Sequence, residues 1–282
     1  MLLGLIGAGI GRSLAPALHE EEARHHGLRV HYQLIDLEGA RGPVPSLPDL
    51  VAALRVFGFR GVNVTHPFKQ AILQLLDGLS HEAAAIGAVN TVVRDGDRLV
   101  GYNTDATGWS WGFARSLPGA KLGRVALLGA GGAGAACAHA VLELGAREVV
   151  VVDRAPARAQ ALAARLNEHT PGNRAHAGEL ASALSGATGL IHATPTGMAG
   201  NPGMPLPESL LAPGMWVSEV VYRPLETPLV KAARARGCIV VDGGHMNVGQ
   251  ALGAFKLFTG LEPDAGRMEA HFRKLASEKE HP

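Results

Sequence analysis

The sequence has little cysteine and no excess of charge of either sign. Its two cysteines, Cys137 and Cys238, stand far apart, without the close spacing that metal ligands require. We therefore expect two buried free thiols and no bound metal. The 26 lysines and arginines nearly balance the 25 aspartates and glutamates, for a formal net charge of +1. This balance gives no electrostatic reason to propose a nucleic acid or a membrane surface as a partner.

Long apolar segments are missing as well. The longest uncharged run lies around residues 129–142, and its glycines and His139 indicate a turn and an amphipathic helix rather than a membrane span. Residues 1–6 are apolar, but they have no basic leader and no long apolar core, so they predict a strand and not a signal peptide. We therefore expect a cytoplasmic protein. A length of 282 residues with 47% hydrophobic residues suits two globular domains, each with its own core.

The stretch from Arg124 to Asp153 organises the expected fold. An apolar run at 125–128, suited to a buried parallel strand, leads directly into the glycine-rich segment 129–134. An alanine-rich helix and a second apolar run at 149–152 follow. This pattern is that of a dinucleotide-binding βαβ unit: a strand, a glycine turn, a helix, and a second strand with an acidic residue at its end.

Each spaced glycine has a physical reason in that pattern. Gly129 permits the tight turn, Gly131 lets a pyrophosphate approach the backbone, and Gly134 lets the helix pack closely on the strand. The helix N-terminus offers N–H groups and the positive end of its dipole to phosphates. Asp153, 24 residues after Gly129, has about the spacing of the carboxylate that accepts hydrogen bonds from an adenosine ribose.

The first half of the chain alternates helices and strands. Residues 7–11 imitate a nucleotide loop, but Arg12 stands where the third spaced glycine would be, so we expect no nucleotide there. Residue patterns predict helices over 14–26, 50–57, 67–76 and 80–85 and strands over 30–34, 61–65, 87–93 and 99–102, the last two joined by a hairpin-like turn at Asp95-Gly96.

Two charged residues in this half stand where catalytic groups could lie. If Thr65 or His66 caps a helix that Pro67 begins, Lys69 falls in the first turn, with its side chain leaning over the end of the preceding strand. A lysine there opposes the helix dipole, which weighs mildly against a purely stabilising role. The pattern alone leaves Lys69 open between a functional and a solvated lysine. It also leaves Asp105 open between a functional carboxylate and a helix cap.

The second half continues the alternation expected of a doubly wound parallel sheet. The patterns predict strands over 189–192, 217–222 and 238–242, helices over 156–167 and 228–236, a helix introduced by residues 243–250 that continues through Phe258, and a last helix over 264–277.

Several motifs occur in a characteristic order along essentially the whole chain. They are Asn63-Val64-Thr65-His66-Pro67-Phe68-Lys69, Gly87-Ala88-Val89-Asn90-Thr91, Asn103-Thr104-Asp105, the glycine loop, Ala193-Thr194-Pro195 and a helix start at Gly249-Gln250. In this order the sequence resembles the shikimate dehydrogenase family, and within it the quinate/shikimate dehydrogenases. The resemblance implies an α/β protein with an N-terminal mixed α/β substrate domain and a Rossmann dinucleotide-binding domain. It places the first domain at residues 1–107, joined by the C-terminal helices of 249–282, and the second at 108–248.

The resemblance also assigns roles to individual residues. Lys69 and Asp105 match the catalytic pair, in which Lys69 takes the proton of a substrate hydroxyl as hydride passes to the nicotinamide, and Asp105 orients the reacting groups. The residues matched to substrate binding are Ser13, Thr65, Asn90, Tyr222 and Gln250. The residues matched to cofactor binding are Gly129, Ala130, Gly131, Gly132, Ala133, Gly134, Asp153, Arg154, Arg158, Thr194, Val220 and Gly243.

Two positions depart from the pattern of the family. Asp153-Arg154-Ala155 stands where its NADP-using members have Asn-Arg-Thr, and an aspartate there accepts a bond from a 2′-hydroxyl but repels a 2′-phosphate. We therefore expect NAD, while Arg154 and Arg158 keep NADP as an alternative. Ala15 replaces a hydroxyl residue that would hold the substrate carboxylate together with Ser13, a loss of roughly 1.5–3 kcal/mol unless Arg12 or a water molecule replaces the bond.

The expected activity is the metal-free, reversible NAD(P)-dependent oxidation of a ring hydroxyl of shikimate, quinate or a related polyhydroxylated cyclic acid. Two alternatives stay open: a dehydrogenase of an amino-substituted relative of these acids, and a nucleotide-responsive regulator without turnover. The apolar C-terminal helices suit a covered core or a second subunit equally well, so the oligomeric state is open between monomer and homodimer.

Overall fold

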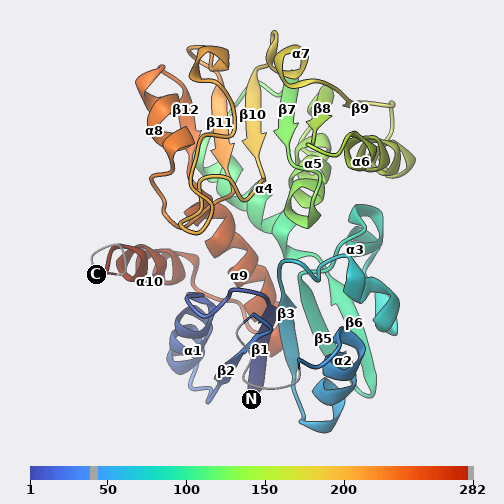
Figure 1. Ribbon diagram of the computed structural model, residues 1–282. Helices are drawn as coiled ribbons and strands as arrows, with labels where there is room; N and C mark the ends of the chain where they lie inside the picture. The colour runs from blue at the N-terminus through green and yellow to red at the C-terminus, as the bar shows by residue number, and fades with distance from the viewer. Residues whose placement is uncertain (39–43, 279–282) are drawn as a thin grey trace. The chain divides into compact units, whose positions relative to one another are not determined.

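The computed structural model describes residues 1–38 and 44–278 (Figure 1). The described residues divide into two compact units, unit 1 with Met1–Thr104 and Gln250–Leu275, and unit 2 with Asp105–Gly249 and residues 276–278. Within the described residues, each unit contains a six-stranded sheet. The domain limits given by the sequence stay a prediction, and their last residues, 279–282, lie outside the described part.

The sheet of unit 1 is mixed, in the spatial order β2-β1-β3-β5-β6-β4. Strand β1 pairs in parallel with β2 and β3, whereas β5 is antiparallel to both β3 and β6. The strands are β1 (Leu2–Gly7), β2 (His31–Asp36), β3 (Gly61–Val64), β4 (Gly78–Leu79), β5 (Thr91–Asp95) and β6 (Arg98–Tyr102). This arrangement confirms the predicted mixed α/β architecture of the first part of the chain.

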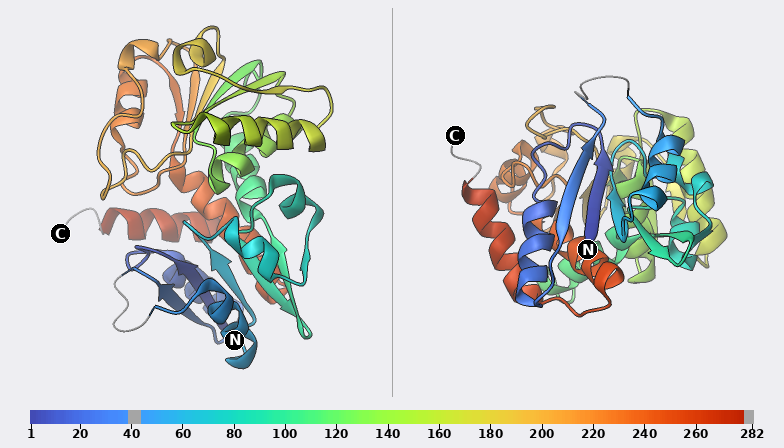
Figure 2. Two further views of the ribbon diagram at one scale, coloured as in Figure 1. Left: turned by 45° about the vertical axis from the view of Figure 1, so that its right-hand side comes forward. Right: turned by 90° about the horizontal axis from the view of Figure 1, so that it is seen from below.

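Alternating side chains of the strands bury both faces of this sheet. Ile6, Val62 and Val64 pack in one core, while Leu3 and Leu5 pack in another on the opposite face. The helices of this part are α1 (Ala15–His25), α2 (Leu47–Val56), the 3₁₀ helix η1 (Ala71–Leu75), α3 (His81–Ile86), the C-terminal part of α9 (Gly243–Thr259) and α10 (Ala265–Glu278). Helices α1 and α10 lie side by side (Figure 2), which confirms that the C-terminal helices return to the first sheet.

The sheet of unit 2 is parallel throughout, in the spatial order β12-β11-β10-β7-β8-β9. Its strands are β7 (Arg124–Leu128), β8 (Glu148–Val152), β9 (Ala175–Ala177), β10 (Gly189–His192), β11 (Trp216–Glu219) and β12 (Ile239–Val241). Numbered along the chain, this is the 3-2-1-4-5-6 order of a Rossmann sheet, which reverses between β7 and β10. The predicted doubly wound sheet is therefore confirmed.

The remaining helices belong to unit 2. They are α4 (Thr104–Ser116), α5 (Gly132–Glu143), α6 (Pro156–His169), α7 (Leu180–Leu184), the 3₁₀ helix η2 (Glu208–Leu210) and α8 (Pro228–Ala235). The Trp109 side chain of α4 is almost fully buried, and its Nε1–H donates to Ser218 Oγ at 2.9 Å. This hydrogen bond connects α4 to β11. It also satisfies the indole N–H, which would destabilise the fold if it were buried without an acceptor.

The predicted helix over 67–76 is wrong. Residues 66–70 form turns, and only the short 3₁₀ helix at Ala71–Leu75 follows. The reason lies in the backbone hydrogen bonds, since the Lys69 carbonyl accepts the N–H of Val89 at 2.8 Å instead of serving a helical turn. Lys69 therefore stands in a turn tied to the segment that precedes β5, and neither Thr65 nor His66 caps a helix.

Three further predictions need correction. Asp105 is not a helix cap, because α4 begins at Thr104 and places Asp105 inside its first turn. The strand predicted over 87–93 begins only at Thr91, since Gly87 ends α3 in the left-handed conformation, with φ of 72°. Helix α9 begins at Gly243 rather than at Gly249-Gln250. Asp242 Oδ1 accepts the N–H of Gly244 at 2.9 Å, which satisfies a first-turn donor at that earlier start.

Within the described ranges, no helix is both long enough and apolar enough to cross a membrane.

Candidate functional site

In the glycine loop of unit 2, two of the three spaced glycines leave no room for a side chain, whereas the third faces open space. A Cβ on Gly129 would lie 2.6 Å from the Ala193 carbonyl oxygen, and one on Gly134 would lie 1.9 Å from that of Gly129. At Gly131, the N-cap of α5, the nearest atom to such a Cβ is Nη2 of Arg158, at 3.9 Å. The residues therefore fit a dinucleotide: a bare backbone cradle at a helix N-terminus, with a guanidinium at its edge, suits a pyrophosphate.

Asp153 stands at the end of β8, beside this loop. Its Oδ2 accepts the N–H of Ala130 at 2.8 Å, and its Oδ1 accepts the N–H of Ala155 at 2.9 Å. Partial burial alone would raise the pKa of Asp153, but the two N–H donors and the charges of Arg158 and Arg154 lower it below its ordinary value. The side chain is therefore a fixed, ionised acceptor at neutral pH.

The other residues matched to the cofactor lie at the carboxyl ends of β10, β11 and β12. Thr194 follows β10, and its Cγ2 lies 3.0 Å from where a Cβ of Gly129 would be. Val220 donates its N–H to the His192 carbonyl at 3.0 Å. A Cβ on Gly243 would lie 2.3 Å from the Val221 carbonyl, so the start of α9 approaches the end of β11 closely. Tyr222, matched to the substrate, is half-buried just beyond Val221.

A buried polar cluster lies behind Thr194, and the sequence motifs did not point to it. His192 and Glu219 are fully buried, with 2.8 Å between Nδ1 and Oε1. His192 Nε2 lies 2.6 Å from Thr194 Oγ1, and Glu219 Oε2 accepts the Thr227 hydroxyl at 2.9 Å. The signal that could have found the pair is register, because His192 and Glu219 are direct neighbours on adjacent parallel strands.

In unit 1 the backbone brings two of the motifs together at one end of the sheet. The hydrogen bond from Val89 N–H to the Lys69 carbonyl joins the turn after β3 to the segment before β5. The next residue, Asn90, accepts the N–H of Val64 on its own carbonyl at 2.8 Å. Lys69 is half-buried and Thr65 also lies at this end, immediately after β3. Thr65, Lys69 and Asn90 therefore share one corner of the unit.

Asn90 joins this corner to the start of α4. Its side chain is 3% exposed, and its Oδ1 accepts the N–H of Thr104 at 2.7 Å, while its Nδ2 donates to Thr104 Oγ1 at 3.0 Å. Thr104 directly precedes Asp105, which is 4% exposed. These bonds hold Thr104, the residue before Asp105, in place; the contact of Asn90 with substrate stays a prediction.

The remaining residues matched to the substrate lie on two other elements. Ser13 is half-buried ahead of α1, and its Oγ accepts the N–H of Ala15 at 3.2 Å, in the first turn of that helix. Gln250 is half-buried inside α9. Among residues 1–38 and 44–278, no three His, Cys, Asp or Glu side chains gather into a group that could hold a metal ion.

The parallel sheet, the open glycine cradle and the fixed carboxylate at the tip of β8 define a dinucleotide-binding α/β protein. Two family models match the chain, the shikimate dehydrogenase substrate binding domain over residues 5–92 and shikimate / quinate 5-dehydrogenase over residues 114–196. The chain belongs to the shikimate/quinate dehydrogenase family.

Relatives resemble the chain over nearly its whole length. A protein of Streptomyces avermitilis named shikimate dehydrogenase (NADP(+)) is 57% identical, over 98% of this chain and 96% of the relative. One of Corynebacterium efficiens named quinate/shikimate dehydrogenase (NAD(+)) is 46% identical, over 98% of each chain. The solved structure of quinate dehydrogenase from Corynebacterium glutamicum in complex with NAD has a TM-score of 0.91 at 44% identity, over 97% of this chain and 99% of that one.

Proposed function

We propose that the protein is an NAD(P)-dependent dehydrogenase that interconverts shikimate and 3-dehydroshikimate, or quinate and 3-dehydroquinate, with a preference for NAD. The observation that carries the proposal is the hydrogen bond between Val89 N–H and the Lys69 carbonyl. It brings a lysine that can exchange a proton next to Asn90, within a chain that also has a complete dinucleotide cradle. The similarity to relatives named for these activities supports the same function.

In this proposal Lys69 and Asp105 handle the proton. When bound, the nicotinamide would supply the hydride acceptor for oxidation of the ring carbon and the hydride donor for the reverse reaction. Lys69 takes the proton of the ring hydroxyl as the carbonyl forms and gives it back in reduction, which requires a neutral amine for the first step. Asp105, held in the first turn of α4, orients the reacting groups. Ser13, Thr65, Tyr222 and Gln250 provide hydrogen-bonding groups for the remaining hydroxyls and the carboxylate.

The preference for NAD follows from Asp153. Its carboxylate is fixed by two N–H donors and is ionised at neutral pH, so it accepts a bond from a ribose 2′-hydroxyl and repels a 2′-phosphate. Arg158 and Arg154 lie near the same carboxylate and lessen that repulsion. The relatives are named for both cofactors, so this preference rests on the geometry of this chain.

The choice of acid rests on the segment before α1. Ser13 offers one hydroxyl, and Ala15, where the family has a hydroxyl residue, offers only its backbone to the Ser13 Oγ. A carboxylate bound there loses one hydrogen bond; because shikimate and quinate both carry that carboxylate, the choice among shikimate, quinate and a related acid stays open. The location in the cytoplasm and the state as monomer or homodimer stay predictions.

Steady-state assays test the function directly. Purified protein is given shikimate or quinate, each with NAD⁺ or NADP⁺, and the absorbance of the reduced nicotinamide is followed. We expect turnover with at least one acid and a higher kcat/KM with NAD⁺. No turnover in any combination, with NAD⁺ still bound, would favour a non-catalytic regulator. Turnover only with an amino-substituted acid would instead favour that alternative.

A lysine variant tests the chemical step. In Lys69→Ala we expect kcat to fall by about 10²- to 10⁴-fold, the range for loss of a general acid–base group, with an unchanged Kd for NADH. Lys231→Ala, at an exposed lysine in α8, is the control and keeps its turnover. Near-normal turnover in folded Lys69→Ala would exclude Lys69 as the proton carrier.

A further inference from the structure

The buried pair of His192 and Glu219 is unused by the mechanism above, although it ends directly beneath Thr194. Both side chains are 0% exposed, and neither was assigned a role by the sequence motifs. Burying polar groups of this kind destabilises the fold unless they are hydrogen-bonded. The partners of His192 and Glu219 determine which atom donates and which atom accepts in each hydrogen bond of the network.

The assignment of donors and acceptors starts from the Glu219 carboxylate. Glu219 Oε1 accepts the N–H of Val221 at 2.9 Å, and Oε2 accepts the hydroxyl of Thr227, whose oxygen in turn accepts the N–H of Val230. Since the carboxylate receives hydrogens on both oxygens, the facing Nδ1 of His192, 2.8 Å from Oε1, is the ring nitrogen that carries the hydrogen.

That tautomer decides what Thr194 presents to a ligand. In the neutral ring, Nε2 is an acceptor, so the Thr194 hydroxyl, at 2.6 Å, donates its hydrogen inward to His192. The hydroxyl oxygen of half-buried Thr194 also accepts the N–H of Thr196 at 3.3 Å, which leaves its second lone pair for a ligand. Thr194 is thereby fixed as an acceptor, because its own hydrogen is committed to the buried ring.

The strand order places this acceptor along the dinucleotide. Asp153 follows β8 on one side of β7, whereas Thr194 follows β10 on the other side. The glycine cradle for the pyrophosphate follows β7, between them, and Thr194 packs against Gly129 of that cradle. With the adenosine ribose at Asp153, the half of the dinucleotide beyond the pyrophosphate extends toward β10.

We propose that His192 and Glu219 are positioning residues that hold the Thr194 hydroxyl as an acceptor for an O–H or N–H group on the nicotinamide half of NAD. The inference rests on the proposed function, since it requires that unit 2 bind the dinucleotide. Neither His192 nor Glu219 contacts the cofactor in this arrangement; each acts through Thr194. The contribution is one well-oriented hydrogen bond.

The test measures the Kd for NADH by fluorescence titration, which needs no turnover, together with the KM for NAD⁺ and for the acid. Thr194→Val removes the acceptor, and we expect the Kd to rise about fivefold to tenfold. Thr194→Ser keeps the hydroxyl and restores the Kd. His192→Asn retains a donor toward Glu219 but is too short to reach Thr194, so it raises the Kd and the KM for NAD⁺ and leaves the KM for the acid unchanged.

A double variant and a matched control separate positioning from mere stability. His192→Asn/Thr194→Val binds NADH no more weakly than Thr194→Val alone, because both changes remove the same bond. Thr170→Val removes a buried hydroxyl hydrogen bond elsewhere in unit 2, from Thr170 Oγ1 to the Leu166 carbonyl at 2.7 Å; it lowers the unfolding midpoint but leaves the Kd for NADH unchanged. Multiplicative effects of the two changes, or an equal rise of Kd in Thr170→Val, would show that the pair only stabilises the fold and overturn the inference.

The outcomes also distinguish this inference from the proposed function. Should His192→Asn fail to fold, Thr194→Val decides alone, since an unchanged Kd in that variant overturns the inference. A wild-type protein that binds NADH while Thr194→Val and His192→Asn bind it equally well refutes the inference and leaves the function intact. A folded wild-type protein that binds no NADH refutes both.

Discussion

At the scale of single residues, the charge of Asp153 is the feature that we expect to select the cofactor. Asp153→Asn keeps an oxygen for one of the two backbone N–H donors and removes the negative charge. We predict that the ratio of kcat/KM for NAD⁺ to that for NADP⁺ falls by about tenfold, since about 1.4 kcal/mol of repulsion is removed. Asp97→Asn, at a fully exposed turn residue, serves as control. An unchanged ratio would show that the charge of Asp153 does not select the cofactor.

His19 gives a second prediction, which concerns stability and pH. The ring is fully buried and stacks on Tyr32 with centroids 5.0 Å apart, and within the described residues neither ring nitrogen has a hydrogen-bond partner. Burial lowers the pKa of His19 from 6.5 to about 4. Between these values the unfolded chain binds the extra proton and the folded protein does not, so the free energy of unfolding decreases as the pH falls.

The decrease from this one residue amounts to roughly 3 kcal/mol at pH 4. His19→Phe keeps an aromatic ring in the stack but cannot take up a proton. We predict that, between pH 7 and pH 4, its free energy of unfolding, measured with urea, falls by that much less than the free energy of the wild type. His81→Gln, at an exposed histidine, follows the wild type. If the free energy of unfolding changed with pH equally in His19→Phe and the wild type, burial of His19 would not be the cause of the pH dependence.

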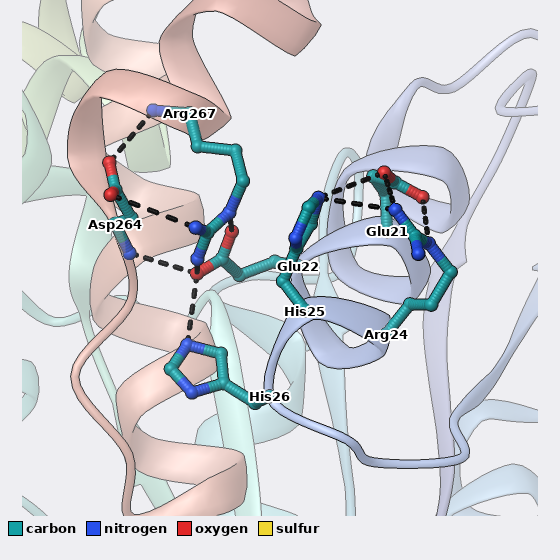
Figure 3. Close-up of polar contacts among 7 residues, drawn as sticks. All are labelled: Glu21, Glu22, Arg24, His25, His26, Asp264 and Arg267. Atoms are coloured by element: carbon teal, nitrogen blue, oxygen red, sulfur yellow. Dashed lines mark hydrogen bonds and ion pairs between the residues drawn. The ribbon is translucent and has the colours of Figure 1, made fainter.

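At the scale of secondary-structure elements, one ion pair joins the helices at opposite ends of the sequence (Figure 3). Glu22 of α1 is 1% exposed and receives Arg267 Nε and Nη2 of α10 at 2.8 and 2.6 Å. The N–H of Asp264 and the ring of His26 bond the same carboxylate, at 2.8 and 3.0 Å. Burial alone would raise the pKa of Glu22, but these donors, Arg267 first among them, lower it below 4.5.

We predict that Arg267→Ala lowers the free energy of unfolding by about 3 kcal/mol at neutral pH, because a buried carboxylate loses its charge partner. The estimate is at the lower end for buried pairs since Arg267 is 31% exposed. A lowered pKa contributes stability above pH 4.5, so the deficit of the variant shrinks as the pH falls below that value. Urea unfolding between pH 7 and pH 3.5 measures both effects.

The neighbouring pair of Glu21 and Arg24 is the matched control, drawn in the same view (Figure 3). It has similar hydrogen bonds, at 2.8 and 2.9 Å, but Arg24 is 66% exposed. Exposed pairs of this kind contribute little, so Arg24→Ala should unfold like the wild type. Equal losses in Arg24→Ala and Arg267→Ala would contradict the role of burial.

Strands were predictable where hydrophobic runs were bounded by turn residues. The strand predicted at 189–192 is β10 with the same limits, and the glycine loop lies where its spacing placed it. The turn that contains Lys69 was not predictable, because its conformation depends on a hydrogen bond from Val89, distant in the sequence. The early start of α9 at Gly243 escaped prediction because local propensity disfavours glycine in a helix, whereas close packing against Val221 requires it there.

The candidate site shows the same division. Residues that belong to continuous motifs, such as Asp153 and Lys69, are visible in the sequence because their neighbours in the chain identify them. His192 and Glu219 come from different strands, and only the register of β10 against β11 brings them together. Long-range pairing of this kind leaves no local pattern, so a buried network is the part of a site that sequence reasoning finds last.

At the scale of the whole molecule, each unit has its own sheet and core, and the aromatic residues are divided unequally between the units. All three tryptophans of the chain, Trp109, Trp111 and Trp216, lie in unit 2. Trp109 and Trp216 are nearly buried. Tryptophan fluorescence therefore reports the unfolding of the unit that has the dinucleotide cradle, whereas far-UV circular dichroism reports both units.

Because the tryptophans lie in the unit with the dinucleotide cradle, cofactor binding can be measured as a change in the unfolding midpoint detected by tryptophan fluorescence. A ligand that binds only the folded state adds RT ln(1 + [L]/Kd), about 2.7 kcal/mol at one hundred times its Kd. We predict that NAD⁺ at this excess raises the tryptophan-detected midpoint by several degrees, and that NADP⁺ at the same concentration raises it less, because Asp153 repels the 2′-phosphate. In Asp153→Asn the two shifts should converge. A larger shift with NADP⁺ in the wild type would assign the selectivity to Arg158, whose guanidinium lies at the edge of the Gly131 cradle.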